Sequence, residues 1–528
     1  MAAFPSIFND VIGPVMRGPS SSHCAASLRI GRLCRDLMGD SIGHVLIEFD
    51  PHGSLATTHK SQGSDMGLFG GFLGWEAYDE RLPESERYLE AEGIKVEIEI
   101  HDIGADHPNT YKLTMSNKDE CHRMTAISTG GGMIEVIEID NSKVAIAGDY
   151  HETLIYCDTA DHLIPYLKNT VAYDEIIWHE ANDEGLRFLE IKAQQFLDEN
   201  IVLEILAMNE VRYVKKLSPV LPVLSRNNLE VPFITSEEML DYNAEKNLEL
   251  WELAVDYESA RGNISRDEVF EKMRSIVRIM RNAIKTGLEG TSYHDRILGS
   301  QSVQLKHQLT NKRLMGGDVN NTIIMYVSAI MEVKSSMGVI VAAPTAGSCG
   351  ALPGAVIGMA DSLELPEEEI VKAMLAAGLI GVFVAAHATF AAEVGGCMAE
   401  CGSGSGMAAA ALVGMANGTL AQSLAAASLA LQNVLGLICD PIGNRVEAPC
   451  LGRNVMAATN AVSCANMALS DYNHLIPLDE VIETMQKVGN EIHHTLRCTN
   501  LGGLSITKAA KDIEQQLENQ DQSFFKIC

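Results

Sequence analysis

Three cysteines in the C-terminal half of the chain lie in settings that suit metal binding. The run EVGGCMAECGSGSGMAAAA contains Cys397 and Cys401, and the run LICDPIGNRVEAPCLGRN contains Cys439 and Cys450. Cys439 precedes Asp-Pro and Cys450 follows a proline, so we expect both in turns outside regular elements. Cys397 follows two glycines and precedes an Ala-rich helix, whose N-terminus favours a thiolate. Thiolates from separate segments suit an iron–sulfur cluster or zinc, but ordinary buried cysteines explain the pattern equally well because no CxxC pair is present.

Two hydroxyl-rich segments have the composition of carboxylate-binding sites. The run SSSH precedes the helical pattern AASLRIGRLCRDLMG, and PTAGS precedes a second, Gly-rich helix start. Hydroxyls and free N–H groups at a helix N-terminus bind anions, although a simple serine cap explains the first segment at least as well. His23 either takes part in catalysis or bonds a carbonyl group. The candidate substrate-binding residues here are Ser20, Ser21, Ser22, Thr345, Gly347 and Ser348.

Composition indicates a soluble globular protein with two to four domains. The chain has 528 residues, of which 46 % are hydrophobic and 21 % charged. Its formal net charge of −30 argues against binding to nucleic acid or to anionic membranes. Twelve scattered cysteines without an N-terminal signal peptide favour a reducing, cytoplasmic location. The apolar run 378–392 is short and Ala-rich, so we expect a buried helix and no membrane span.

Periodicity predicts a multidomain α+β chain. Residues 1–142 combine a helical segment with several strands and predict an α/β domain. Residues 143–218 have a βαββαβ rhythm, which matches a small ferredoxin-like fold. Residues 219–236 form a Pro-containing linker, and 237–528 show helical spacing that predicts an all-α domain around the cysteines.

Several motifs together resemble the iron–sulfur L-serine dehydratases over nearly the whole chain. APTAGSCGALPG (343–354), the GGC run (395–410), CDPIG with PCLGRN (439–454) and GGL (502–504) resemble the α domain of that family. IFNDVIGPVMRGPSSSH resembles its β domain, so the chain resembles a single-chain form with fused β and α domains. The ferredoxin-like unit resembles an ACT regulatory module. Its first turn, 158–162, lacks the usual glycine, so we favour a structural or dimer-forming role over effector binding.

The resemblance implies a cofactor and a reaction. It implies a [4Fe–4S] cluster on Cys397, Cys439 and Cys450, with the C-terminal Cys528 capping the fourth iron. A random cysteine on a dangling tail is the alternative for Cys528. The implied activity is L-serine ammonia-lyase: an open iron acts as Lewis acid, water is eliminated, and pyruvate and ammonia are released without pyridoxal phosphate. The alternatives are a related lyase for L-cysteine or L-threonine and a non-enzymatic amino-acid sensor. A homodimer is the default assembly.

The resemblance also suggests site residues. The family loop K-G-H-x-T-D reads KSQGSD here, so Gln62 replaces a histidine and cannot carry a proton at neutral pH. The residue that removes the Cα proton stays open among the candidates His23, Asp65 and His107. Further substrate-binding candidates are Asn109, Ser128, Arg453 and Asn454, where Arg453 forms either a carboxylate clamp or a structural ion pair. Cys349 and Cys401 are interpreted as core cysteines, with a spare cluster ligand as the alternative for Cys401. Glu393 and Glu400 flank Cys397, and acid–base work, orientation of a ligand and no role at all are open for them.

Overall fold

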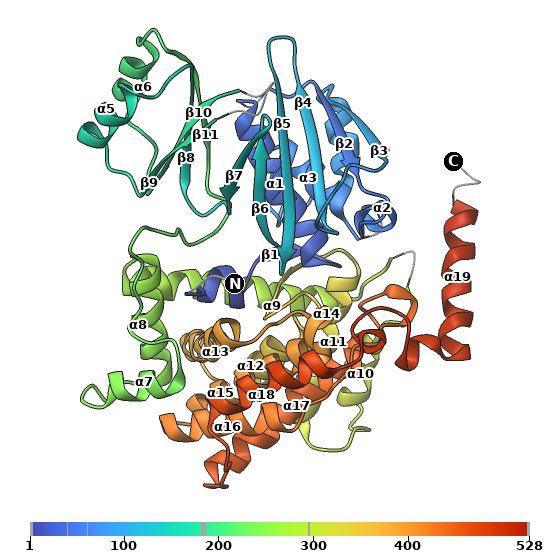
Figure 1. Cartoon of the computed structure of the whole chain (residues 1–528). Helices are drawn as coiled ribbons and strands as arrows, with labels where there is room; N and C mark the ends of the chain where they lie inside the picture. Colours follow the sequence, from blue (N-terminus) through green and yellow to red (C-terminus); the bar gives the residue numbers. More distant parts are fainter. Residues whose placement is uncertain (1–3, 40, 61, 181–185, 294–295, 525–528) are drawn as a thin grey trace. The chain divides into compact units, whose positions relative to one another are not determined.

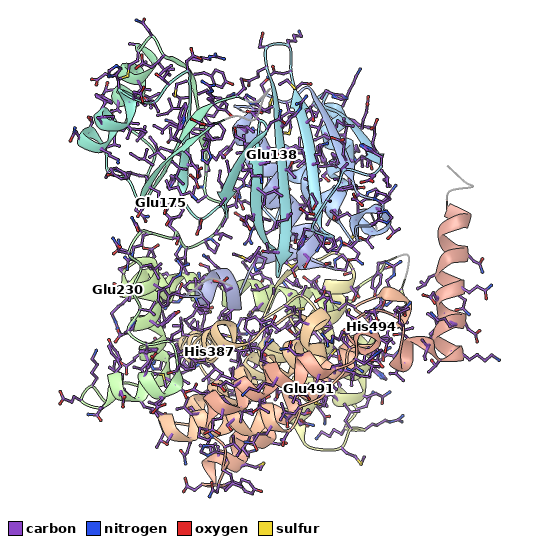
Figure 2. The ribbon with its side chains drawn as sticks, in the orientation of Figure 1. Glu138, Glu175, Glu230, His387, Glu491 and His494 are labelled. Atoms are coloured by element: carbon purple, nitrogen blue, oxygen red, sulfur yellow. The ribbon has the colours of Figure 1, made fainter. Side chains whose placement is uncertain are left out.

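The computed structural model describes residues 4–39, 41–60, 62–180, 186–293 and 296–524 (Figure 1). The chain divides into two compact units. The N-terminal unit is Ser20–Leu229, and the C-terminal unit combines Met1–Pro19 with Glu230–Cys528. The fold is mixed α+β, with several sheets in the first unit and helices dominating the second. Exposed side chains such as Glu175, Glu230 and Glu491 belong to the acidic excess of the sequence (Figure 2).

A six-stranded sheet forms the first part of the N-terminal unit. Its strand order is β3-β2-β4-β5-β6-β7, with β2 and β3 parallel and the other neighbours antiparallel. Buried and less buried residues alternate along β4 and β5, as the sequence pattern predicts for strands with one covered face. The strands are β2 (His44–Phe49), β3 (Lys95–Ile100), β4 (Thr110–Ser116), β5 (Cys121–Gly130), β6 (Met133–Ile139) and β7 (Ser142–Ile146).

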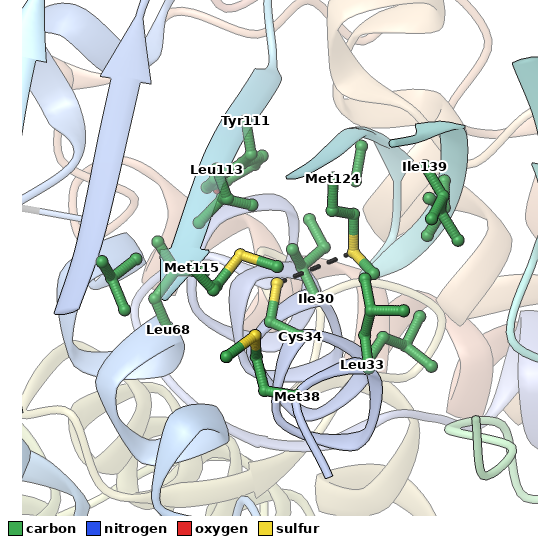
Figure 3. Packing of buried hydrophobic residues seen from close by; sticks show 14 of the residues in the cluster. Ile30, Leu33, Cys34, Met38, Leu68, Tyr111, Leu113, Met115, Met124 and Ile139 are labelled. Carbon is green, nitrogen blue, oxygen red and sulfur yellow. Dashed lines mark hydrogen bonds between the residues drawn. The ribbon is translucent and has the colours of Figure 1, made fainter. Parts of the chain in front are cut away.

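Helices α1 (Ala26–Leu37) and α3 (Ser64–Phe72) pack closely against each other, and α1 contacts β5 and β6 of this sheet. Their close approach requires glycine, because a Cβ at Gly31 would lie 3.0 Å from the Cα of Gly71. The Cys34 thiol donates to Met124 Sδ at 3.6 Å within the core between helix and sheet (Figure 3). Cys34 is therefore a structural cysteine. The short helices of this region are α2 (Leu55–Thr58) and α4 (Ser85–Ala91).

The rest of the N-terminal unit has the βαββαβ order expected from the sequence. Its antiparallel sheet has the order β11-β8-β10-β9. One face carries Leu189 and Ile191 in a core of its own, whereas Leu154 and Tyr156 on the other face belong to the core of the first sheet. The two sheets thus share a core across the expected boundary at 142, and the ACT-like assignment stays a prediction. The elements are β8 (His151–Cys157), α5 (Leu163–Thr170), β9 (Glu175–His179), β10 (Phe188–Ala193), α6 (Glu199–Leu206) and β11 (Val211–Leu217).

The C-terminal unit is a helical assembly. Helix α13 is long and apolar enough to cross a membrane. However, 78 % of its most apolar 18-residue stretch is buried inside the protein, as in the core helix of a globular protein. The buried helix expected over 378–392 is thus present up to His387. The helices are α7 (Ser236–Asn243), α8 (Leu250–Gly262), α9 (Arg266–Glu289), α10 (Gln301–Thr310), α11 (Asp318–Ser335), α12 (Ala351–Ser362), α13 (Glu367–His387), α14 (Ala392–Cys397), α15 (Ser403–Met415), α16 (Leu420–Gln432), α17 (Cys450–Leu469), α18 (Leu478–Glu491) and α19 (Lys508–Phe524).

The N-terminal segment Met1–Pro19 belongs to this helical unit. The sequence instead predicts this segment in a domain of residues 1–142. Strand β1 (Val15–Arg17) pairs antiparallel with β12 (Val339–Val341). The C-terminal unit therefore contains a small sheet and differs from the all-α domain that the sequence predicts. The Glu258 carboxylate accepts hydrogen bonds from Ser6 Oγ at 2.5 Å and from the Ile7 N–H at 2.8 Å. Ile7, Phe8, Val11 and Ile12 of this segment are fully or almost fully buried.

Candidate active site

Cys397 lies where one helix ends and the next helical run begins. Gly396 has φ +69° and interrupts the helix, and a Cβ there would lie 2.7 Å from the carbonyl oxygen of Leu437. The Met398 N–H then donates to that same carbonyl at 3.0 Å, and the chain remains helical through α15. The expected placement of Cys397 at a helix N-terminus is confirmed.

Cys439 and Cys450 have different backbone settings. Cys439 is extended and pairs with the segment around Arg497: its N–H donates to the Leu496 carbonyl at 2.8 Å, and its carbonyl accepts from the Cys498 N–H at 2.8 Å. Cys450 is the first residue of α17. The expectation that Cys450 lies outside regular elements is therefore wrong, because a proline at residue 449 is well tolerated at the start of a helix.

Two of the expected ligands and one carboxylate form a compact donor set. The Sγ atoms of Cys397 and Cys439 and an oxygen of Glu400 all lie within 4.8 Å of one another. Hydrogen bonds from the thiols of Cys401 and Cys439, together with the charge of Arg453, lower the pKa of Cys397 well below that of an ordinary thiol, although burial opposes this. A donor set with two buried thiols and one half-buried carboxylate fits iron–sulfur or zinc chemistry and suits hard cations poorly.

Cys450 interacts electrostatically with this set without belonging to the compact group. Burial raises the pKa of the Cys450 thiol, and the charge of Cys397 raises it further. Cys349 is a core residue that contacts Met331, as expected. Cys401 packs with Ala351 and Ala457 in the core.

The sequence left two roles open for Arg453, a carboxylate clamp and a structural ion pair, and the structure contains the ion pair. The Arg453 guanidinium pairs with Asp440 and donates to Cys397 Sγ at 3.3 Å. The second carboxylate oxygen of Asp440 accepts from the Leu504 N–H at 2.6 Å. Arg453 thus ties a proposed ligand to the segment that follows Cys439, and its role as a substrate clamp stays a prediction.

The PTAGS segment packs directly against Glu400. Thr345 Oγ1 donates to Glu400 Oε1 at 2.7 Å and lies 3.1 Å from Ser348 Oγ. A Cβ at Gly347 would come within 2.8 Å of the same carboxylate, so this approach requires glycine. Burial, followed by the negative charge of Cys397, raises the pKa of Glu400 to about 8. The predicted carboxylate-binding segment and the cysteine donor set therefore meet at one side chain.

Asn454 connects this segment to α17. It is fully buried, and its Oδ1 accepts from the N–H groups of Gly350 at 3.2 Å and Ala351 at 3.1 Å. Its Nδ2 donates to the carbonyls of Gly347 at 2.8 Å and Cys450 at 2.9 Å. These four bonds use the ordinary capacity of an amide, so Asn454 positions the segment and the Cys450 backbone.

Lys334 is a residue of the site that sequence reasoning missed. It is fully buried, and its ammonium donates to the carbonyl of Val446, between Cys439 and Cys450. Its charge lowers the pKa of Cys450 and of Glu400, although burial has the larger, opposite effect on both. A lysine in a helical pattern normally faces solvent, so only the burial seen in the structure identifies it.

His23 of the N-terminal unit is buried between two hydroxyl groups. Its Nδ1 lies 3.0 Å from Ser20 Oγ, and its Nε2 lies 3.0 Å from Thr58 Oγ1. Burial lowers the pKa of His23 to about 4, so the ring is neutral at pH 7. Ser21 and Ser22 begin the helical turn that leads into α1, as predicted from the sequence.

Asp65 and His107 have local partners of their own. Asp65 accepts from His59 Nδ1 at 2.8 Å, and His107 Nδ1 accepts from the Asn109 N–H at 3.1 Å. The Asn109 carbonyl accepts from the Ser128 N–H at 3.1 Å, which joins the HPNT segment to the S-x-GGG turn. The Ser128 hydroxyl is buried and has no hydrogen-bond partner among the described residues. Cys528 lies outside the described residues.

Comparison with known proteins agrees with these motifs. The family model for the serine dehydratase alpha chain matches residues 245–505. The probable L-serine dehydratase alpha chain of Bacillus subtilis is 35 % identical over 285 residues, covering 54 % of this chain and 95 % of that protein. The probable beta chain of the same organism is 34 % identical over 220 residues, covering 41 % and 99 %.

A single-chain relative spans both regions. The L-serine dehydratase of Streptomyces coelicolor is 28 % identical over 509 residues, covering 93 % of this chain and 96 % of that protein. Counterparts of an alpha chain and of a beta chain are thus both present in one polypeptide. This chain belongs to the L-serine dehydratase family.

Proposed function

We propose that this chain is an L-serine ammonia-lyase that eliminates water from L-serine and releases pyruvate and ammonia. The relatives of this chain are named as L-serine dehydratases, so the chain is a lyase that acts on serine. The observation that carries the proposal is the meeting of Cys397, Cys439 and the PTAGS segment at Glu400. The relatives do not favour the L-cysteine or L-threonine alternatives or a non-enzymatic sensor.

Cys397, Cys439 and Cys450 are the residues that would hold a [4Fe–4S] cluster, and Cys528 stays a candidate cap for the fourth iron. When bound, the cluster supplies an iron that acts as a Lewis acid toward the hydroxyl of serine. The proposal does not include pyridoxal phosphate. Arg453 holds the Cys397 thiolate in place, and Asn454 fixes the backbone of Cys450.

The PTAGS segment would bind the substrate carboxylate. Thr345 and Ser348 supply hydroxyl groups beside the donor set, and Asn454 fixes the carbonyl of Gly347 between them. Neighbouring hydroxyls and N–H groups satisfy a carboxylate without a second buried charge. Ser20, Ser21, Ser22, Asn109, Ser128 and Arg453 remain proposed substrate-binding residues.

The base that removes the Cα proton is proposed among His23, Asp65 and His107. His23 is neutral at pH 7, so one of its ring nitrogens can accept a proton. The Asp65 carboxylate is engaged by His59. We further propose a cytoplasmic homodimer that acts on a small molecule and binds neither nucleic acid nor membrane, consistent with the net charge of −30.

The test is anaerobic pyruvate release from L-serine by the reconstituted full chain, with iron and sulfide counted on the same sample. We expect about four irons per chain and rapid pyruvate release. The ratio of kcat/KM values for L-serine, L-cysteine and L-threonine identifies the substrate. A full cluster without pyruvate would refute the substrate, and protein without iron would refute the cofactor.

A further inference from the structure

Lys334 carries a buried positive charge for which the proposed function has no role. It lies in the last turn of α11, and its side chain is fully buried. Its ammonium group donates a hydrogen bond to the carbonyl of Val446, and among the described residues it forms no ion pair. A charge inside a protein is unfavourable unless an opposite charge lies beside it. The burial of Lys334 therefore points to a negative partner that the described residues do not supply.

The acidic residues next to this contact in the sequence are held by other groups. Glu332 precedes Lys334 by two positions, and its carboxylate accepts from the Ser302 N–H at 3.0 Å and from Ser302 Oγ at 2.7 Å. Glu447 follows the residue that Lys334 contacts, and its carboxylate accepts from the Leu298 N–H at 2.7 Å. Both carboxylates thus bind the start of α10 and the residues before it, and neither forms an ion pair with Lys334.

Arg453 is a second cation of the site, and its charge already has a partner. Its guanidinium pairs with the Asp440 carboxylate and donates to Cys397 Sγ at 3.3 Å. The positive charge of Arg453 is therefore balanced by a carboxylate of the chain, whereas that of Lys334 is not. The two cations cannot have the same role.

The charge of Lys334 acts directly on the donor set. It lowers the pKa values of Cys349, Glu400 and Cys450, although burial raises all three and has the larger effect. Of the cations that act on these groups, Lys334 has the largest influence on each. The ammonium is therefore close enough to a proposed ligand for its charge to act on a group bound there.

The N-terminal segment holds the turn that carries Lys334. A Cβ at Gly18 would clash with the carbonyl oxygen of Lys334, so the two backbones are in contact. The Gly18 N–H donates to the Gly338 carbonyl at 3.3 Å, and Arg17 Nη1 donates to the Met337 carbonyl at 3.1 Å. Because these contacts cover the end of α11, the lysine cannot turn toward solvent without their loss.

We propose that Lys334 is the counter-charge of the bound cluster. This inference rests on the [4Fe–4S] cofactor of the proposed function. An oxidised cluster held by three thiolates has one net negative charge, which a single unpaired ammonium balances. A fixed positive charge also withdraws electron density from the irons, which strengthens their action as a Lewis acid toward the serine hydroxyl. Lys334 acts through the cluster without touching the substrate and is thus a positioning residue.

The first test measures the reduction potential of the reconstituted full-length protein. Lys334→Met and Lys334→Gln remove the charge, whereas Lys334→Arg keeps it. Lys192→Met is the matched control, because Lys192 is a buried lysine of the N-terminal unit that pairs with Glu190 at 3.4 Å. Redox titration followed by electron paramagnetic resonance of the reduced cluster gives the midpoint potential of each protein.

We expect Lys334→Met and Lys334→Gln to make reduction about tenfold less favourable, which is a shift of about 59 mV to a more negative potential for one electron. Lys334→Arg and Lys192→Met should keep the potential of the unmodified chain. An unchanged potential in Lys334→Met and Lys334→Gln, with the cluster intact, would overturn the inference and leave the cofactor standing. An unmodified chain without any cluster would overturn the inference and the proposed cofactor together.

Urea denaturation of the cluster-free proteins separates a counter-charge from a purely structural lysine. Without the cluster the charge of Lys334 is unbalanced, so Lys334→Met should raise the urea midpoint. Lys192→Met should lower the midpoint, because it leaves the buried Glu190 carboxylate without its cation. A lower midpoint in both Lys334→Met and Lys334→Gln would show that Lys334 serves the fold alone.

Steady-state kinetics with L-serine distinguish the cluster from the substrate carboxylate as the partner of Lys334. We expect Lys334→Gln to lower kcat several-fold and to leave KM nearly unchanged, because the lost charge weakens the Lewis acid. A several-fold higher KM together with an unchanged reduction potential would assign Lys334 to the substrate carboxylate and overturn its role as counter-charge.

Discussion

At the scale of single residues, the Asn454 amide connects the proposed carboxylate-binding segment with a proposed cluster ligand. Asn454→Ala removes four hydrogen bonds and leaves two backbone N–H groups buried without their partner. We expect a loss of about 3 kcal/mol in the free energy of unfolding, measured by urea denaturation of the cluster-free protein. Asn466→Ala, at an exposed position of the same helix, is the control and should have little effect. Equal stability of the two variants would contradict the positioning role.

His23 gives a prediction about pH. Burial lowers its pKa from 6.5 to about 4, so between these values the unfolded chain binds a proton that the folded chain does not. The free energy of unfolding should therefore rise as pH increases from 4 to 6.5, by about 3 kcal/mol at most, and the contribution should be constant above this window. His23→Gln keeps a donor and an acceptor and should remove this slope.

The measurement follows tryptophan fluorescence during urea denaturation at a series of pH values. In a W251F background the signal comes from Trp75 and Trp178, both in the N-terminal unit. The matched control is His494→Gln, an exposed position of the other unit, which should leave the slope unchanged. If His23→Gln keeps the slope of the parent protein, His23 is not the residue responsible.

At the scale of elements, one buried glutamate holds the N-terminal segment on α8. Glu258→Ala leaves the Ser6 hydroxyl and the Ile7 N–H without their acceptor, and we expect a loss of about 2 kcal/mol in stability together with faster proteolysis before residue 13. Trp251 lies on the same helix and reports the unfolding. Glu258→Gln keeps one acceptor and should lose less. Equal proteolysis of the parent protein and Glu258→Ala would show that the segment is held by other contacts.

Glu258 also predicts a pH dependence opposite in sign to that of His23. Burial raises the pKa of Glu258 from 4.5 to about 7, so the folded chain holds the extra proton between these values. This contribution to stability is complete below pH 4.5 and is lost as pH rises through 7. Glu258→Gln, which is neutral at every pH, should remove the decrease, and its persistence in that variant would assign it to another group.

The sequence predicts elements well where the signal is local. Alternating residues predict β4 and β5, because neighbouring residues alone determine this pattern. The pairing of β1 with β12 joins residues more than 300 positions apart, and no local pattern encodes it. Cys498 and Lys334 escape prediction for the same reason, since their positions depend on distant carbonyl groups of Cys439 and Val446.

At the scale of the whole molecule, one compact unit is built from two separate stretches of the chain, because Met1–Pro19 belongs to the same unit as Glu230–Cys528. The alpha-chain and beta-chain relatives from Bacillus subtilis are separate proteins, and a division of this chain at the boundary between its two units would fall after Leu229. Such a cut would leave Met1–Pro19 on the wrong piece, because this segment packs in the C-terminal unit. Ile7 contacts Gly378 and Val11 contacts Gly381, where a larger residue of α13 would leave no room.

We therefore expect residues 230–528 alone to be less stable than the same residues with the N-terminal segment. Without the N-terminal segment, β12 loses its only partner strand among the described residues, and Glu258 loses two hydrogen-bond donors. An apolar surface on α13 also becomes exposed to solvent. Adding a peptide of residues 1–19 should raise the Tm of the 230–528 piece by several degrees, whereas a peptide with Ile7, Phe8 and Val11 replaced by serine should not. Equal Tm values with either peptide would show that the helical part folds independently of the segment that precedes it by more than 200 residues.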